Sequence, residues 1–396
     1  MTRTSHAHPA LITLALAMGA FSIGTTEFAA MSLLPYFSAG LGINVPTAGH
    51  VISAYALGVV AGAPVIAVLG ARLPRRSLLI GLMALFALAN GLSALAPTYG
   101  WMLLFRFLSG LPHGAYFGVA ALVAASMVPN DQRTQAVAKM FAGLTIATVI
   151  GVPFANWMGQ AIGWRWGFGI VAVLALTTVT LVALFAPNQR PDAAASPLRE
   201  LGALRKSQVW LTLLTGAIGF GGLFGVYTYV ASTMIEVTHV SERLVPVVFM
   251  LFGVGMTVGN LVAARFADRM LSRTVIVLML WSAFSLALFP IAAGNIWSLG
   301  LVVLMIGMGG GLGTVLQTRL MDVAGDAQTL AASLHHSAFN IANALGPWLG
   351  GLSIAAGHGL LSTGWIGCAL SLMGLSVFLL SLALEARGAR VQTAPC

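Results

Sequence analysis

ALITLALAMGAFSIGTTEFAAMSLL, residues 10–34, is a run of 25 residues with a single charged side chain, Glu27. A helix of about 20 apolar residues is long enough to cross the roughly 30 Å hydrocarbon core of a bilayer. The run is too long for the apolar segment of a signal peptide, and it continues through Glu27. We therefore interpret it as an uncleaved first membrane span that contains one carboxylate.

Comparable apolar runs recur along all 396 residues, of which 58% are hydrophobic and only 7% charged. A water-soluble protein has about 25% charged residues, so the composition indicates an all-α polytopic membrane protein. Short charged or Pro/Gly-rich breaks divide the chain into twelve predicted transmembrane helices. Their limits are 10–34, 46–69, 77–96, 101–126, 134–158, 164–186, 209–232, 244–266, 274–293, 296–318, 329–356 and 360–384.

The basic residues are distributed unequally between the two sides of this array. The side that contains both termini receives sixteen of the 19 Lys and Arg residues, whereas the other side receives only Arg165 and Arg243, and Arg106 falls within a span. Basic loops remain in the cytoplasm, so both termini are predicted to be cytoplasmic. The net charge of +9 is therefore explained by topology, and no dense basic patch with interleaved aromatics indicates nucleic acid.

A hydrophilic stretch at 186–208 separates two sets of six spans. We expect an N-terminal six-helix bundle at 1–187, a cytoplasmic linker at 188–208 and a C-terminal bundle at 209–396. The loops ARLPRRSLL and ARFADRMLSRTV follow the second and eighth spans, and an offset of 197 residues pairs Arg72 with Arg269 and Arg76 with Arg273. The alternative to duplication is a chance match, which the bias toward basic residues in cytoplasmic loops favours. Duplication is the preferred interpretation, since parallel six-helix repeats are a transporter architecture.

Together these motifs resemble the major facilitator superfamily over essentially the whole chain. ARFADRMLSR is similar to its loop signature through Asp268 and Arg269, although Ala71 replaces the usual Asp in the first copy. RFLSGLPHG resembles its Arg-x-x-x-Gly-x-x-x-Gly pattern in span four. The GTTEF motif followed by AGHVISAYALGVVAGAP resembles the drug/proton antiporter branch, in particular the arabinose-efflux-like and sugar-efflux permease group.

Glu27 and Arg106 are the candidate proton-coupling residues. Glu27 is the only acidic residue predicted deep within a span, where a charged side chain costs about 3 kcal/mol or more. Because burial disfavours the charged carboxylate, Glu27 is expected to bind a proton near neutral pH. Arg106 stays charged, and its approach to Glu27 would oppose protonation. The alternatives are a structural carboxylate held by hydrogen bonds and an arginine that braces helix ends.

The candidate residues of the substrate cavity come from the resemblance and from one polar stripe. The resemblance implies that spans one, four, seven and ten line a central cavity, with Met31, His113, Phe224, Tyr227 and Met308 as candidates. His336, Asn340, Asn343 and Pro347 fall on one face of span eleven. Packing between helices is the alternative role for each of these side chains.

The candidate gating residues lie in the repeated loops, and the candidate hinges lie in spans five and eleven. The loop residues are Arg72, Arg76, Asp268, Arg269 and Arg273, which are also topology markers. Gly151 with Pro153 and Gly346 with Pro347 are the hinge candidates, since proline removes a backbone hydrogen bond and kinks a helix.

We therefore expect a proton-coupled secondary transporter that exports a small organic solute, either drug-like or a sugar, by alternating access. An uptake symporter or passive facilitator on the same fold is the alternative; an integral membrane enzyme or receptor is disfavoured, since no phosphate loop or catalytic set is found. The expected partners are the solute, protons and the lipid bilayer. We expect a monomer in a bacterial inner membrane, with no cofactor, no metal and no enzymatic activity.

Overall fold

The computed structural model describes residues 9–70, 73–128, 133–187, 201–324 and 328–392. The first half contains α1 (Pro9–Ser32), α2 (Leu34–Leu41), α3 (Val45–Gly70), α4 (Arg75–Ala94), α5 (Tyr99–Gly110), α6 (His113–Ser126), α7 (Arg133–Ile146), the π-helix η2 (Ala147–Gly151), α8 (Val152–Ile162) and α9 (Trp164–Phe185). The second half contains η3 (Leu201–Arg205), α11 (Ser207–Gly219), α12 (Gly221–Glu236), η4 (Glu242–Leu244), α13 (Val245–Ala292), α14 (Ile296–Met308), α15 (Gly311–Ala324), α16 (Gln328–Ser353), the π-helix η5 (Ile354–His358) and α17 (Ser362–Gln392).

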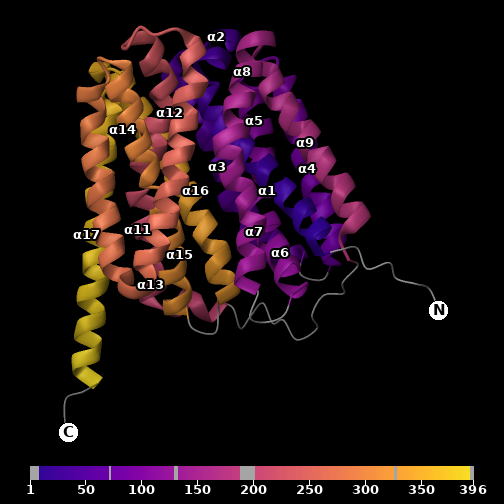
Figure 1. The fold of residues 1–396 in the computed structure, drawn as a ribbon, viewed down its shortest axis with the longest axis vertical. Helices are drawn as coiled ribbons and strands as arrows, with labels where there is room; N and C mark the ends of the chain where they lie inside the picture. Colours follow the sequence, from indigo (N-terminus) through magenta and orange to yellow (C-terminus); the bar gives the residue numbers. More distant parts are fainter. Residues whose placement is uncertain (1–8, 71–72, 129–132, 188–200, 325–327, 393–396) are drawn as a thin grey trace.

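The fold is all-helical, as predicted, with the two halves side by side (Figure 1). Within the described ranges, ten helical stretches are long and apolar enough to cross a membrane. The two other predicted spans correspond to α5 with α6 and to α16. The first of these is divided into two short helices, and the second carries the polar stripe. Both irregular spans therefore contain candidate site residues.

Several predicted spans are not single helices: span seven divides at Phe220 and span ten at Gly309 and Gly310. The fourth span is not one helix, because it divides at Leu111 and Pro112 into α5 and α6. Proline has no amide hydrogen for the preceding turn, which explains the break. The expected break between spans eight and nine is confirmed, because α13 consists of two helices that meet at a kink within the ARFADRMLSR motif. Only the backbone of Met270 leaves helical geometry there, at φ −145° and ψ 58°.

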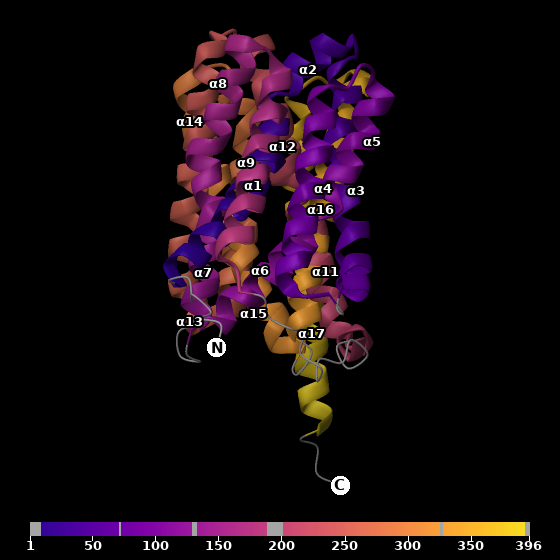
Figure 2. The same cartoon turned by 90° about the vertical axis from the view of Figure 1, so that its right-hand side faces the viewer.

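Short turns set the antiparallel order of neighbouring helices. Gly163 separates α8 from α9 with φ +109°, a conformation that a residue with a Cβ rarely adopts. At the start of α14, the side chain of Asn295 caps the helix by accepting a hydrogen bond from the Trp297 amide at 2.8 Å. The beginning of α1 and the end of α17 lie at the same end of the molecule, which we call the terminal end (Figure 2).

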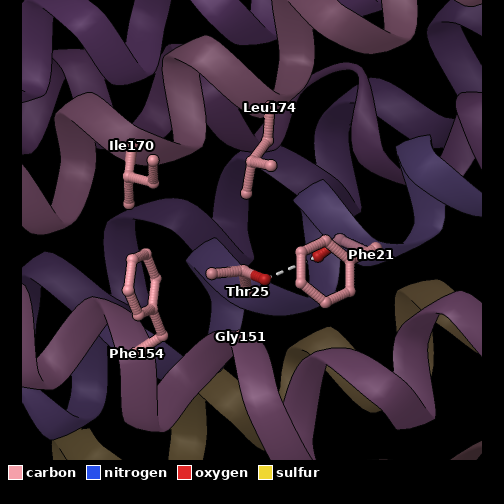
Figure 3. Close-up of a pocket in the computed structure, with 6 residues that line it drawn as sticks. All are labelled: Phe21, Thr25, Gly151, Phe154, Ile170 and Leu174. Atoms are coloured by element: carbon pink, nitrogen blue, oxygen red, sulfur yellow. Dashed lines mark hydrogen bonds between the residues drawn. The ribbon is translucent and has the colours of Figure 1, made fainter.

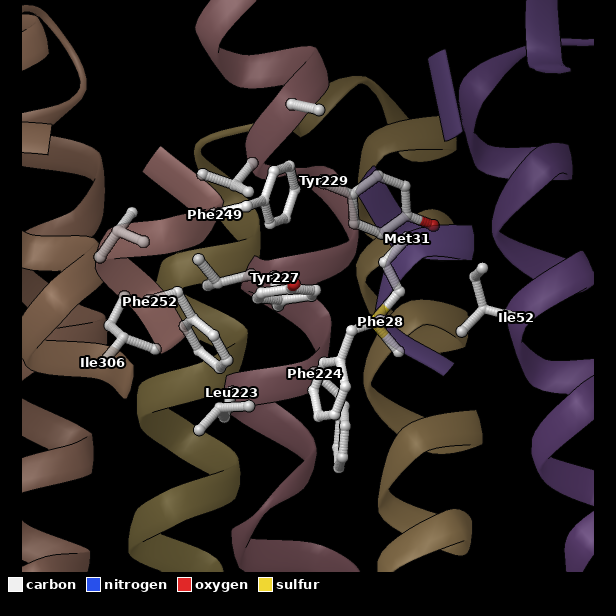
Figure 4. Packing of buried hydrophobic residues seen from close by; sticks show 14 of the residues in the cluster. Phe28, Met31, Ile52, Leu223, Phe224, Tyr227, Tyr229, Phe249, Phe252 and Ile306 are labelled. Carbon is white, nitrogen blue, oxygen red and sulfur yellow. The ribbon is translucent and has the colours of Figure 1, made fainter. Parts of the chain in front are cut away.

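The two bundles contact each other along α3 and α16 and along α13 and η2. Ser53 of α3 donates a hydrogen bond to the carbonyl of Ala344 on α16 at 3.0 Å. A Cβ added to Gly253 of α13 would lie 2.6 Å from the Thr148 carbonyl of η2, so glycine permits this close backbone approach. The largest buried apolar cluster includes residues of both halves (Figure 4). The bundle contact is therefore part of the core.

Candidate functional site

Arg106 of α5 is completely buried, and its side chain is held by polar groups from the first bundle. Its Nη1 donates to Thr26 Oγ1 at 3.2 Å, to Asn90 Oδ1 at 3.4 Å and to Ser109 Oγ at 3.5 Å. The Thr26 hydroxyl in turn donates to Asn90 Oδ1 at 2.7 Å. Neutral oxygens from α1, α4 and α5 thus replace water at Nη1, whereas the buried Nε has no hydrogen-bond partner.

Two aromatic rings complete the environment of Arg106. The guanidinium carbon lies 4.4 Å from the ring centroid of Tyr55 on α3 and 5.4 Å from that of Phe168 on α9. These distances are within the range of cation–π attraction. Among the described contacts, every partner of Arg106 belongs to the first bundle. The charge is therefore a fixed part of that bundle rather than of the contact between bundles.

Glu27 of α1, the residue next to Thr26, is 7% exposed and contacts the opposite bundle. Asn343 of α16 donates a hydrogen bond from Nδ2 to Glu27 Oε1 at 3.3 Å. Of the acidic side chains that the structure describes, Glu27 is the one that is buried. The ion pair found among the described residues joins Arg319 to Glu385 at 2.6 Å, so Glu27 and Arg106 do not form a salt bridge in this conformation.

An aromatic cluster across the bundle contact follows directly after Glu27 in the chain (Figure 4). The ring of Phe28 lies 6.3 Å from that of Phe224, 5.4 Å from that of Tyr227 and 6.2 Å from that of Phe252. Met31, one turn later on α1, is fully buried beside these rings. The predicted candidates Met31, Phe224 and Tyr227 therefore lie close to Glu27, packed against one another in this conformation.

A second contact between the bundles lies nearer the terminal end and involves histidines. The ring of His336 on α16 is parallel to those of Phe117 on α6 and Phe141 on α7, with centroids 5.3 and 5.8 Å away. His113 is 6.4 Å from His336, and its Nδ1 shares a hydrogen bond of 2.8 Å with the Tyr55 hydroxyl. Tyr55 thus contacts both Arg106 of α5 and His113 of α6, although the break between α5 and α6 separates Arg106 from His113.

The other cavity candidates have different neighbours. Asn340 donates to the His336 carbonyl of its own helix at 2.9 Å. Met308 ends α14, where its backbone packs against Gly259 of α13. A cavity of about 220 Å³ opens elsewhere, between α1, α8 and α9 (Figure 3). Its lining residues are Phe21, Thr25, Gly151, Phe154, Ile170 and Leu174, of which only Gly151 was singled out from the sequence.

The predicted loop residues have separate environments. Arg76 at the start of α4 donates to the Ala183 carbonyl of α9. Arg269 is exposed, and Arg273 donates only a weak hydrogen bond, to Met270 Sδ at 3.7 Å. Arg72 and the side chain of Asp268 lie outside the described residues, as does most of the predicted linker, so the gating role of these loops stays a prediction.

The hinge candidates coincide with irregular or closely packed helix geometry. Gly151 ends the π-helix η2, and Pro153 follows in the first turn of α8. Pro347 lies inside α16, and its carbonyl accepts a hydrogen bond from the Tyr229 hydroxyl at 2.8 Å. Gly346 approaches the backbone of Gly221 and Gly225 so closely that a Cβ would overlap it. π-Helical turns are frequent at functional sites.

Sequence reasoning did not single out the partners that define these environments. Thr26, Asn90 and Tyr55 are polar or aromatic residues within apolar spans, and the only available signal was their polarity in a membrane segment. Asn343 was noted in the polar stripe of span eleven, but nothing in the sequence paired it with Glu27. The ion pair between Arg319 of α15 and Glu385 of α17 was not predicted either.

Two six-helix bundles that meet around buried ionisable groups are the architecture of a secondary membrane transporter. The chain belongs to the Major Facilitator Superfamily, whose sequence profile matches residues 16–270 and 224–394. The protein is therefore a transporter and not an enzyme, and the resemblance predicted from its motifs is confirmed.

Curated relatives cover most of the chain. It is 42% identical to the inner membrane transport protein YdhP of Escherichia coli strain K12, over 87% of this chain and 89% of that protein. It is 33% identical to a chloramphenicol resistance protein of Streptomyces lividans, over 91% of this chain and 94% of that protein. Identity to a probable sugar efflux transporter of Haemophilus influenzae strain PittGG is 30%, over 92% of each.

A solved structure shows the same fold at low sequence identity. The crystal structure of a mutant form of the nucleoside transporter NupG superposes with a TM-score of 0.76. The alignment covers 93% of this chain and 99% of that chain at 13% identity. This likeness concerns the fold alone.

Proposed function

We propose that this chain is a proton-coupled exporter of a small organic solute, inserted in a bacterial inner membrane with both termini in the cytoplasm. Export is supported by the names of the chloramphenicol resistance and sugar efflux relatives, and the location by that of the Escherichia coli relative. Proton coupling is supported by one observation: the buried carboxylate of Glu27 takes its hydrogen bond from Asn343 of the opposite bundle.

Proton binding at Glu27 changes the energy of the bundle contact. An ionised carboxylate only accepts hydrogen bonds, so the Asn343 amide N–H stabilises that form when the bundles are close. A protonated Glu27 loses most of this preference, because the neutral acid is a weaker acceptor. The separation of α1 from α16 therefore depends on whether Glu27 holds a proton. A ligand shifts such an equilibrium only through its differential affinity for the two states, and the proton does so here.

Arg106 influences Glu27 through Thr26 without contacting it. The guanidinium donates to Thr26, the neighbour of Glu27 in α1, and stays with the first bundle as the bundles separate. It therefore supplies a constant positive charge near the carboxylate in both arrangements of the bundles. In this proposal Glu27 is the residue that carries the proton, and Arg106 is a positioning residue.

The test uses purified protein in proteoliposomes with an imposed pH gradient. A sugar or antibiotic that stabilises the protein thermally serves as the transported probe. An acidic lumen should drive accumulation of the probe when the cytoplasmic face is outside, whereas uptake driven in the opposite sense would indicate a symporter. Glu27→Gln should abolish accumulation but retain exchange of labelled for unlabelled probe. Glu236→Gln, at an exposed acid of α12, is the matched control and should transport normally.

A further inference from the structure

A set of buried polar atoms in the second bundle has no hydrogen-bond partner. In the described part of the chain these atoms include the Tyr227 hydroxyl, Thr228 Oγ1, Asn340 Oδ1 and Asn343 Oδ1. All four residues are at most 2% exposed, and they lie on only two helices, α12 and α16. Buried polar groups in proteins are nearly always hydrogen-bonded, to protein or to ordered water, so these four atoms are available to a polar ligand or to water.

The face of α16 that carries the two amides is turned toward the first bundle. His336 stacks on Phe117 and Phe141 of that bundle. Asn340 and Asn343 follow four and seven residues later, on the same side of the helix. The Asn343 amide confirms this direction, because its Nδ2 reaches Glu27.

The face of α12 that carries the two hydroxyls is turned the same way. Phe224 and Tyr227 both contact Phe28 of α1. Thr228 lies one turn after Phe224, so it borders the junction of α1, α12 and α16. The Ser232 hydroxyl, one further turn along α12, also lacks a partner and continues this row of polar groups.

The amide pair and the hydroxyl pair follow each other along the axis of the bundle. Gly346 of α16 packs between Gly221 and Gly225 of α12, which fixes the relative height of the two helices. The two asparagines precede that level on the side of the terminal end, whereas the two hydroxyl residues follow it toward the opposite end. A line of neutral hydrogen-bonding groups thus crosses the bundle contact, with Glu27 bound to Asn343 and the ring of Phe28 against that of Tyr227.

We propose that Tyr227, Thr228, Asn340 and Asn343 form the polar wall of the substrate site and select a neutral solute with several hydroxyl groups. The inference rests on the proposed function, since separation of the bundles is what exposes this wall. The two amide oxygens can only accept hydrogen bonds, and the two hydroxyls can donate or accept, so the matching solute donates at least two. The aromatic rings favour an apolar face on the same solute.

Both a sugar and a hydroxylated amide such as chloramphenicol meet this description, and binding to purified protein distinguishes them. The probes are arabinose, glucose, lactose and chloramphenicol, with the hydroxyl-free cation tetraphenylphosphonium as comparison. The wild type should bind at least one hydroxylated probe. The probe that binds shows whether the solute is a sugar or a hydroxylated amide. Binding of none of the four would overturn the proposed substrate class.

Substitution at Thr228 tests the wall itself. Thr228→Val removes one hydroxyl at nearly constant side-chain volume and should weaken binding of the hydroxylated probe about tenfold. Thr228→Ser, which keeps the hydroxyl, should restore binding. Thr233→Val is the matched control on the same helix, because the Thr233 hydroxyl already donates to the Tyr229 carbonyl at 2.9 Å. Tetraphenylphosphonium, which has no hydroxyl group, should give the same result with the wild type and with both Val variants. Wild-type affinity of Thr228→Val for the hydroxylated probe would refute the assignment.

This outcome is independent of proton coupling. Binding in detergent needs no gradient, so a coupling defect leaves it unchanged. Conversely, if Glu27→Gln still accumulated solute while Thr228→Val lost binding, the proposed function would fail and the polar wall would stand.

Discussion

Arg106 and Glu27 are two buried charged side chains linked through adjacent residues of α1, yet their surroundings differ in kind. Arg106 donates to Thr26, Asn90 and Ser109, which all belong to its own bundle. Glu27 accepts from Asn343 of the other bundle. A charge satisfied within one rigid body keeps its environment when the bodies move, whereas a charge satisfied across them does not. The difference assigns a structural role to the arginine and a switching role to the carboxylate.

The largest effect is expected from Glu27→Gln. The amide has almost the same shape but cannot bind and release a proton, so accumulation against a gradient should disappear entirely. Exchange at equal concentrations should remain, because the bundles can still rock. The comparison of accumulation with exchange in proteoliposomes measures this directly, and accumulation at the wild-type rate would refute the role of Glu27.

Arg106→Ala should mainly destabilise the fold. It leaves a cavity beneath Tyr55 and removes the donor from Thr26, Asn90 and Ser109, with an expected loss of roughly 2–4 kcal/mol. Thermal unfolding in detergent provides the measurement. Arg165→Ala is the control, since that arginine is exposed and donates one hydrogen bond, to the Ala96 carbonyl. If the Arg106→Ala protein had normal stability but no coupling, Arg106 would have the switching role and not the structural one.

Asn343→Leu should weaken coupling without abolishing it. The ionised carboxylate would lose a hydrogen bond worth about 1.5 kcal/mol, so accumulation should slow roughly tenfold. Solute binding in detergent, measured on the same variant, separates this effect from the loss of the Asn343 oxygen in the polar wall. Asn156→Leu sharpens the comparison, because Asn156 is also a buried amide but donates to the Ser32 carbonyl within the first bundle, at 2.9 Å. Initial rates for the two variants should differ although both lose an amide. Equal rates would contradict the importance of the bundle contact.

Glu385→Gln should have the smallest effect. Glu385 pairs with Arg319, but its side chain is 48% exposed and both residues belong to the second bundle. Screening by solvent limits such a pair to less than about 1 kcal/mol. The melting temperature should change slightly, and accumulation of the solute should not change. A coupling defect in Glu385→Gln would show that charge pairs within one bundle also take part in proton coupling.

Much of the architecture could be predicted from the sequence because it depends on hydropathy and length. The order of apolar runs indicated the helical array, and the rarity of acids in them identified Glu27 as a buried carboxylate. The π-helical turn that ends at Gly151 lies where a glycine and a proline were noted within a span, and Pro347 was noted as a proline inside the helix that is now α16. These inferences need only local composition, which a single sequence provides.

The partners of each buried group could not be predicted, since they depend on tertiary packing. The pairing of Glu27 with Asn343 joins residues 316 positions apart. The unpartnered Thr228 hydroxyl was missed because threonines in membrane helices usually bond to their own backbone. Packing decided each of these cases.

The most direct test of the account is an infrared difference titration of the purified protein, which detects the C=O stretch of a protonated carboxylic acid. The account predicts a band that disappears as the pH rises, is absent in Glu27→Gln, shifts in Asn343→Leu and is unchanged in Asn156→Leu. The account would be contradicted if Glu27 stays ionised across the whole pH range, or if the band is unchanged in Asn343→Leu.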